Sequence, residues 1–373
     1  MNHPDNAGSA ATPELEDSSL VDALKALAEN DGVEPELGEA LRRTIDLIDH
    51  EFTPDAPFLS VILRTQGKRF EPFKDALTCL AAQTDQDFEV VVVDHDAEPE
   101  AAKRVREAID MQMPSFRERI RVIEVSGGSR AKPLNAAIDV VKGRYVAVYD
   151  DDDILFANWV EEFHTASRVA GSRMLRSLTA TQQVKPELWP QQHQGFRTIS
   201  WPKAEYAPRF VQFDHFIVNH SPFMSWAFPR QLFSRLGYRF DEELSVCEDW
   251  DMILRGSLLL GVHDVPALTA IYRRWEGGTS SYTEHTRDSW AASEARVLRK
   301  LNASVLLLAP GTVTRVRELM AFQEYESARK TLVMVLNSRS WKLTRPLRGA
   351  ERVAQYGRRL AGRAVRRIRR GVR

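Results

Sequence analysis

A run of seven residues, 88–94, constrains the fold of this chain more than any other segment. It reads Phe-Glu-Val-Val-Val-Val-Asp, so four consecutive valines precede an acid. Valine favours strands, and a strand that is apolar on both faces is typical of a parallel sheet covered by helices on both sides. The segment therefore predicts a buried strand of an α/β sheet that ends in Asp94.

The segments around that run alternate between strand and helix patterns. Strands are expected at 60–65, 120–125 and 145–149, and helices around 77–81, at 101–111 and at 133–141. This alternation predicts an α/β, doubly wound domain with a mostly parallel sheet, whose ligands bind beyond the carboxyl ends of the strands. Thr65, Asp94 and Asp150 all lie at such ends.

The formal charge of −1 hides two oppositely charged ends. Residues 1–55 hold 14 acidic and 3 basic side chains, whereas 341–373 hold one acid and 12 bases. We therefore expect an ordinary globular centre between an acidic arm and a basic interaction tail.

Composition also excludes several classes of protein. No apolar run approaches the roughly 18 residues of a membrane span, and residues 1–5 lack the basic and apolar regions of a signal peptide. Two cysteines, Cys79 and Cys247, are too few for a disulfide framework or a cysteine zinc site. The expectation is a cytoplasmic protein.

Four consecutive aspartates, 150–153, follow the strand expected at 145–149. Like charges this close raise one another's pKa unless a cation lies beside them. Mg²⁺ or Mn²⁺ would resolve the repulsion, because hard divalent ions prefer carboxylate oxygens and are commonly shared with a substrate diphosphate. Alternate side chains of an extended segment point the same way, so Asp150 and Asp152 can face one ligand. The alternative is an acidic turn in which Asp153 caps a helix beginning near Phe156.

Several motifs follow one another in a fixed order. They are residues 60–65 (Ser-Val-Ile-Leu-Arg-Thr), 82–84 (Ala-Gln-Thr) with 88–94, 135–138 (Asn-Ala-Ala-Ile), 143–153 (Gly-Arg-Tyr-Val-Ala-Val-Tyr and the four aspartates), 240–244 (Phe-Asp-Glu-Glu-Leu) and 247–251 (Cys-Glu-Asp-Trp-Asp). Together they resemble the family 2 glycosyltransferases of GT-A fold, of the type that acts on bacterial surface polysaccharides. The last two motifs resemble that family's acceptor side.

The resemblance implies how a nucleoside-diphosphate sugar would be held as the donor substrate. Thr65 and Asp94 would hold the nucleoside. Asp150, with Asp151 beside it, would lie near the ribose, and Asp152 would bind Mn²⁺ or Mg²⁺ together with Asp150.

The resemblance also implies an inverting, metal-dependent transfer to a hydroxyl of a glycan or lipid-linked acceptor. Asp249, preceded by Glu248, matches the family's catalytic base. Inversion is a single in-line displacement, so one base suffices, and the leaving diphosphate needs charge neutralisation rather than a proton. Arg130 or Lys132 is a candidate phosphate contact, with a solvated loop charge as the alternative.

The sequence departs from the family pattern in two places. After Asp94 the usual acid-acid-glycine-serine turn reads His95-Asp96-Ala97, which leaves the nucleotide base open. In the segment 272–280, Trp275 stands where a histidine near the metal or diphosphate often occurs. His285 is a candidate replacement metal ligand, and a solvated loop histidine is the alternative.

The segment between the two motif blocks, 171–246, is rich in aromatic and histidine residues. Aromatic faces stack on sugar rings, which favours an acceptor groove, whereas aromatic side chains in irregular segments also bury themselves to hold loops together. Both interpretations stay open for Trp189, His193, Trp201, Tyr206, His215, His220 and Trp226.

The basic tail, 341–373, has the pattern of an amphipathic helix. On a helical wheel, Val353, Tyr356, Leu360 and Ile368 share a face opposite nine arginines. Such a helix suits an anionic membrane surface, so we expect a peripheral protein on the inner face of the cell membrane. Packing on the protein itself is the alternative, and nucleic-acid binding is disfavoured because only one aromatic residue is interleaved with the arginines.

The expected organisation follows from these assignments. It comprises a disordered acidic lead (1–18), a helical segment (19–55), a GT-A catalytic domain (56–300, divided at 155/156 into nucleotide-sugar and acceptor halves), a helical extension (301–340) and the basic tail (341–373). Two other functions fit the sequence less well. A sugar-1-phosphate nucleotidyltransferase would need a Gly-rich loop after the first strand, where only Gly67 occurs, and a non-catalytic nucleotide-binding adaptor would not need Glu248 and Asp249.

Overall fold

The computed structural model describes residues 19–49, 55–188, 194–277, 284–307 and 311–338. Contacts divide the chain into two compact units, residues 1–310 and 311–373. The expected acidic lead and basic tail lie outside the described residues. The domain boundaries expected from the sequence stay predictions.

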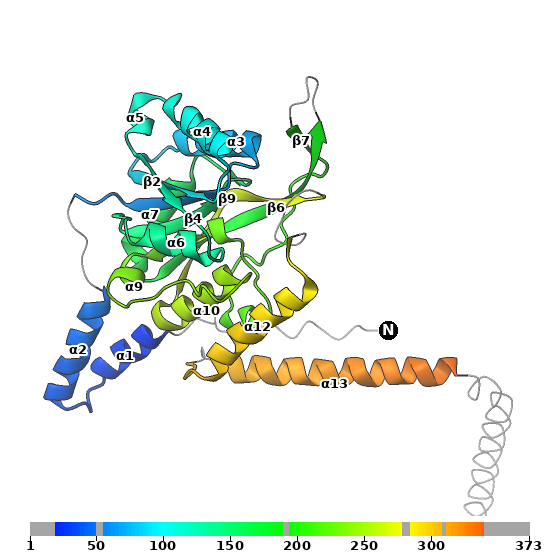
Figure 1. Cartoon of the computed structure of the whole chain (residues 1–373). Coiled ribbons are helices and arrows are strands. Elements are labelled where there is room, and N and C mark those ends of the chain that lie inside the picture. The colour runs from blue at the N-terminus through cyan, green and yellow to red at the C-terminus, as the bar shows by residue number, and fades with distance from the viewer. Residues whose placement is uncertain (1–18, 50–54, 189–193, 278–283, 308–310, 339–373) are drawn as a thin grey trace, which may run out of the picture. The chain divides into compact units, whose positions relative to one another are not determined.

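The first unit is built on a curled sheet with the strand order β3-β2-β1-β4-β8-β6-β9-β5 (Figure 1). Its first four strands are mutually parallel: β1 (Leu59–Thr65), β2 (Phe88–His95), β3 (Ile120–Val125) and β4 (Tyr145–Asp150). The four valines of β2 are fully buried, as the sequence predicts. Register places Thr65 beside Asp94 and Arg64 beside Asp150, so the polar ends of three strands meet at one edge.

Helices cover both faces of this parallel half. One core cluster joins α3 (Phe70–Ala81) and α4 (Pro99–Asp110) to Val61, Val90 and Val92, whereas the other joins α6 (Ala131–Ile138) to Ile62, Val91 and Val93. Alternate strand residues therefore serve opposite faces. Helix α6 ends three residues before the expected Val141, where the Val140 amide donates to the Ala137 carbonyl across three residues, a tighter turn than that of an α-helix. A short helix α5 (Pro114–Arg117) was not predicted.

The second half of the sheet is mixed. Strand β8 (Trp226–Pro229) is antiparallel to β4 and to β6 (Met174–Leu188), and β6 pairs in parallel with β9 (Val262–Trp275). Short strands β5 (Ile154–Leu155) and β7 (Gln194–Thr198) complete it. The helical elements are α7 (Trp159–Ala170), α8 (Gln212–His215), η2 (Phe223–Ser225), α9 (Gln231–Ser234), α10 (Glu248–Leu260) and α12 (Arg287–Asn302).

Two helices precede the sheet, as the leucine stripes predict. They are α1 (Leu20–Ala28) and α2 (Pro35–Asp49). A reciprocal capping box between Ser19 and Asp22 starts α1. Val21 and Ile48 enter the core, and Asp22 pairs with Arg173 at 2.6 Å, which fastens this segment to the domain.

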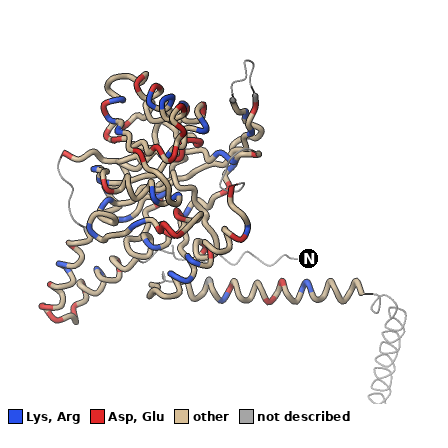
Figure 2. Tube along the Cα trace, in the orientation of Figure 1, with Lys and Arg blue, Asp and Glu red and all other residues tan. Residues whose placement is uncertain are grey.

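The described part of the second unit is a single long helix, α13 (Thr312–Asn337). Its large apolar side chains are mostly exposed, and its last seven residues carry no charge (Figure 2). Within the described ranges, no helix combines the length and apolarity that crossing a membrane requires.

Candidate functional site

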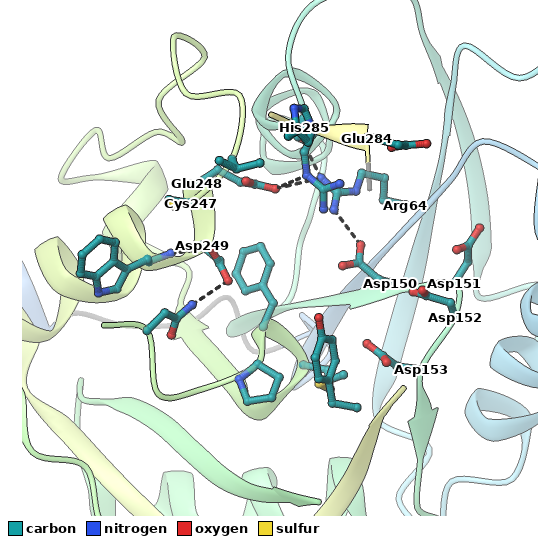
Figure 3. Close-up of a pocket in the computed structure, with 18 of the residues that line it drawn as sticks. Arg64, Asp150, Asp151, Asp152, Asp153, Cys247, Glu248, Asp249, Glu284 and His285 are labelled. Carbon is teal, nitrogen blue, oxygen red and sulfur yellow. Dashed lines mark hydrogen bonds and ion pairs between the residues drawn. The ribbon is translucent and has the colours of Figure 1, made fainter. Parts of the chain in front are cut away.

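A pocket of about 1170 Å³ opens at the carboxyl ends of β1, β2 and β4 and reaches the start of α10 (Figure 3). This is the edge at which the sequence places the ligand site. The volume is ample for a nucleotide sugar, because small-molecule pockets occupy roughly 300–1,000 Å³. Both predicted acidic groups, Asp150–Asp153 and Glu248-Asp249, line it.

Asp150 is held by an arginine at the end of the neighbouring strand. The Arg64 guanidinium lies 2.9 Å from the Asp150 carboxylate, and Arg64 is itself 91% buried. Burial opposes ionisation of Asp150, but Arg64 and then Arg130 outweigh it and hold the pKa of Asp150 below its ordinary value. Asp150 is therefore a permanent anion facing the pocket.

The three aspartates that follow have different surroundings. Asp151 is buried and accepts a hydrogen bond from the Thr65 hydroxyl, and burial raises its pKa. Asp152 faces the pocket and pairs with Arg69. Asp153 accepts from the Arg273 amide at 2.8 Å, and burial raises its pKa well above the ordinary value. Asp153 is thus not a helix cap; α7 starts later, at Trp159, after Asn158.

Glu248 links the two walls of the pocket, which are the sheet edge with Asp150–Asp153 and the start of α10 with Glu248 and Asp249. Its carboxylate lies 2.9 Å from Arg130 and 3.3 Å from Arg64, the same arginine that holds Asp150 (Figure 3). Burial alone would raise the pKa of Glu248, but Arg130 and Arg64 hold it below its ordinary value. Glu248 is therefore an ion-pair partner of both arginines, and its catalytic role stays a prediction.

Asp249 has no cation against its carboxylate among the described residues. It accepts a hydrogen bond from the Asn219 amide at 2.8 Å and from the Trp250 N–H at 2.7 Å. Burial, and then the adjacent Glu248 carboxylate, raise the pKa of Asp249 to about 7. The preceding Cys247 has a left-handed backbone (φ 67°), an uncommon conformation for a non-glycine residue, and it turns the chain so that both acids begin α10.

Two of the predicted donor contacts, Asp94 and Lys132, lie outside the pocket lining. Asp94 is buried, its carboxylate accepts from the Ala97 amide at 3.1 Å, and it does not line the pocket; His95 and Asp96 do. Lys132 also lies outside the lining, because its ammonium donates to the Ser126 carbonyl at 2.6 Å.

Thr65 and Arg130 do line the pocket, as predicted. The Thr65 hydroxyl is already engaged with Asp151 and with the Gly67 N–H at 3.0 Å. Of the two candidate phosphate contacts, Arg130 is therefore the one that faces the site.

The carboxylates have the donor chemistry of a divalent-cation site. Mg²⁺ is commonly held by one or two carboxylates together with substrate phosphates. Asp150 and Asp152 keep 29% and 14% of their side-chain surface exposed in the pocket, so they fit such an ion. His285 lines the pocket but Figure 3 draws it away from Asp152, and across the described ranges no three His, Cys, Asp or Glu side chains gather as a ligand set. The predicted third ligand is therefore not supported: His285 lies just before α12.

The aromatic segment contributes less to the pocket than an acceptor groove would require. Of its candidates within the described residues, only Tyr206 lines the site; His215 and Trp226 are buried, and Trp201 is 87% exposed elsewhere. Trp189 and His193 lie outside the described residues. His215, at the end of α8, and Trp226, at the start of β8, are therefore packed into the protein interior.

Sequence reasoning missed Arg64, Arg69 and Asn219, each of which contacts at least one of the acids in the pocket. Arg64 lies inside the predicted first strand, where an arginine next to an apolar run was the available signal. No sequence pattern marks Asn219.

The decisive comparison is with protein families. Residues 60–225 match the model of a family described as Glycosyl transferase family 2. Residues 60–225 are thus similar to glycosyl transferase family 2. The match covers rather less than half of the chain and ends before the helix that carries Asp249. The expected GT-A fold class of this domain is confirmed by the family match and by the parallel strands β1–β4 with their covering helices.

Solved structures similar to the chain include those of S. aureus TarS. TarS 1-349 in complex with UDP-GlcNAc is 17% identical over 63% of this chain and 64% of that chain, with a TM-score of 0.47. TarS 1-349 in complex with UDP is 18% identical over 58% of this chain and 60% of that chain, with a TM-score of 0.43. TarS itself is 19% identical over 58% of this chain and 37% of that chain, with a TM-score of 0.42. The chain thus spans less than two thirds of the TarS chains it matches. A search of curated protein sequences finds no match.

Proposed function

We propose that this family 2 domain transfers a sugar from a nucleoside-diphosphate sugar to a hydroxyl of a glycan or lipid-linked acceptor, with inversion at the anomeric carbon. The proposed setting is the synthesis of a cell-surface polysaccharide. One observation carries the proposal: a single pocket holds arginine-paired carboxylates at the sheet edge and, opposite them, Asp249 with a pKa of about 7.

In the proposed reaction Asp249 acts as the general base. Its carboxylate takes the proton of the acceptor hydroxyl while that oxygen bonds to the anomeric carbon. The bond from that carbon to the diphosphate breaks at the same time, and the nucleoside diphosphate leaves with the bonding electrons. A base with a pKa near the operating pH combines a large ionised fraction with useful basicity.

The sheet edge is the proposed donor subsite. Asp150 would accept from the ribose hydroxyls, Arg130 would contact a phosphate, and His95 with Asp96 would border the base. Asp152, with Asp150, would hold Mn²⁺ or Mg²⁺, and a bound cation would neutralise the leaving diphosphate. Asp152→Asn should therefore abolish any increase in melting temperature that Mn²⁺ adds to that given by the nucleotide alone.

A thermal-shift screen tests the donor assignment. Nucleoside-diphosphate sugars should raise the melting temperature, because a ligand that binds only the folded state stabilises it. NMR of the product formed by the active donor should then show the inverted anomeric configuration. Retention would contradict the mechanism, and no response to any nucleotide would contradict the proposed function.

The basic tail is proposed to bind an anionic membrane surface, which would bring the domain to a lipid-linked acceptor. Twelve bases against one acid support an electrostatic contribution of about 1 kcal/mol per basic residue near the surface. The full chain should sediment with anionic vesicles but not with neutral ones, and a chain ending at residue 340 should sediment with neither. Equal binding to both kinds of vesicle would refute the electrostatic form of the proposal.

A further inference from the structure

Asn219 contacts the proposed base directly and lies far from it in the sequence. It belongs to the loop between α8 and η2 and lines the pocket. Its Nδ2 donates to Asp249 Oδ2 at 2.8 Å, while its Oδ1 accepts from the Ser221 N–H at 3.1 Å. A backbone N–H cannot accept, so this second contact fixes the amide oxygen and turns the NH₂ group toward Asp249.

The loop that carries Asn219 is anchored by buried polar contacts. The Ser221 hydroxyl accepts from Arg176 Nε at 2.9 Å and lies 3.2 Å from His215 Nε2. The His215 carbonyl accepts from Trp250 Nε1 at 2.7 Å, which joins the loop to α10 one residue beyond the base. Buried hydrogen-bond networks hold their members in one geometry. Asn219 is therefore supported on both sides of its contact with Asp249.

The charged groups around Asp249 come from three elements. Glu248 on α10 and Asp150 on β4 raise its pKa, and Arg130 before α6 lowers it. The Cys247 thiol is adjacent, and burial, with Asp249 and Glu248, raises the pKa of that thiol to about 12, so it stays neutral. Burial lowers the pKa of His215 to about 3, so the anchoring loop adds no charge there either. Asn219 thus contributes a neutral donor, which orients a carboxylate without the strong pKa depression that a cation causes.

We propose that Asn219 is the positioning residue of the base: its amide holds the Asp249 carboxylate in the orientation that takes the acceptor proton. This inference rests on the proposed function of Asp249. It adds a residue outside the motifs named in the sequence analysis, from a segment whose aromatic members mostly do not reach the pocket.

The test is the Asn219→Asp variant, with Asn135→Asp as the matched control. Asn219→Asp keeps the oxygen that accepts from Ser221 and replaces only the group that faces Asp249. Two carboxylates at this distance share a proton and titrate as a pair. The acidic limb of the kcat/KM profile should therefore move up by about one pH unit or more, with activity recovering at high pH.

Asn135 makes comparable contacts and does not line the pocket. Its Oδ1 accepts from the Phe240 N–H at 2.9 Å, and its Nδ2 donates to the Phe240 carbonyl at 3.0 Å and to the Glu242 carboxylate at 2.8 Å. Asn135→Asp should not shift the acidic limb of the kcat/KM profile. Donor affinity should be unchanged in Asn219→Asp. A rate that falls equally at every pH, with a wild-type melting temperature and no movement of the limb, would overturn the positioning role.

A titration of ¹³C-labelled aspartate carboxyls separates this inference from the proposed function, because it needs no turnover. The Asp249 signal should titrate at higher pH in Asn219→Asp than in the wild type. If the titration shifts while no donor or acceptor reacts, the contact is upheld and the transferase function fails. If sugar transfer occurs but Asn219→Asp shifts neither the titration of Asp249 nor the pH profile of kcat/KM, the positioning role is wrong and the proposed function stands.

Discussion

The two acidic walls of the pocket differ in what faces each carboxylate. At the sheet edge, guanidinium groups pair with Asp150 and Asp152, and the pKa of Asp150 is lowered. At the start of α10, Asp249 meets a neutral amide and an anionic neighbour, and its pKa rises to about 7. Identical side chains thus become a fixed anion on one wall and a group with a raised pKa on the other, because their partners differ.

Removing the proton acceptor should have the largest effect. Asp249→Asn should lower kcat by about 10²- to 10⁴-fold, the usual worth of a general base, with unchanged donor affinity by calorimetry. A wild-type transfer rate in Asp249→Asn would show that the base lies elsewhere.

The same variant should stabilise the fold at neutral and higher pH. The Asp249 pKa is about 7 when folded and roughly 3.9 when unfolded, so the folded state binds more protons between those values and loses stability as the pH rises through them. Asn does not titrate. The gain in melting temperature from Asp249→Asn should therefore be larger at pH 8 than at pH 4, and a pH-independent difference would contradict the raised pKa.

Glu248 links the two walls, so its removal should change both the stability of the fold and the pH profile of the reaction. Glu248→Gln leaves Arg130 and Arg64 short of a buried partner, and the free energy of unfolding should fall by about 3 kcal/mol in urea titrations. The charge that raises the Asp249 pKa is also lost, so the acidic limb of the kcat/KM profile should move to lower pH. A limb that moves upward would refute the electrostatic link.

Arg130 and Lys132 provide a matched pair of smaller effects at the donor wall. Arg130→Met should weaken donor binding about ten-fold, in keeping with a charged hydrogen bond. Lys132→Met should change donor affinity by less than about two-fold, because the ammonium contacts a loop carbonyl outside the pocket. Calorimetry compares them directly, and equal losses would return Lys132 to the donor site.

The sequence predicts the parallel half of the domain well because its signals are local. Apolar runs and helical spacing mark β1–β4 and the helices between them within about 90 residues. Strands β6 and β9 pair across the intervening α8–α10 segment, with a register shift near Leu178, and no local period signals such a partner.

For the site, the residue types were predictable but their partners were not. The aspartate run and Asp249 stand out in the sequence, whereas the turn that engages Asp94 and the loop that presents Asn219 depend on contacts made only after folding. Acidic residues that are candidates for binding or catalysis can be recognised from the sequence pattern. Which carboxylate stays charged is decided by neighbours that the chain brings together from distant segments.

The pH dependence of wild-type kcat/KM tests the contrast between the walls most directly. We predict an acidic limb with an apparent pKa near 7, below which the rate falls about ten-fold per pH unit, since only the ionised base accepts the acceptor proton. A limb near pH 4, as for an ordinary aspartate, or a flat profile from pH 5 to 8, would contradict the account of Asp249 as the base.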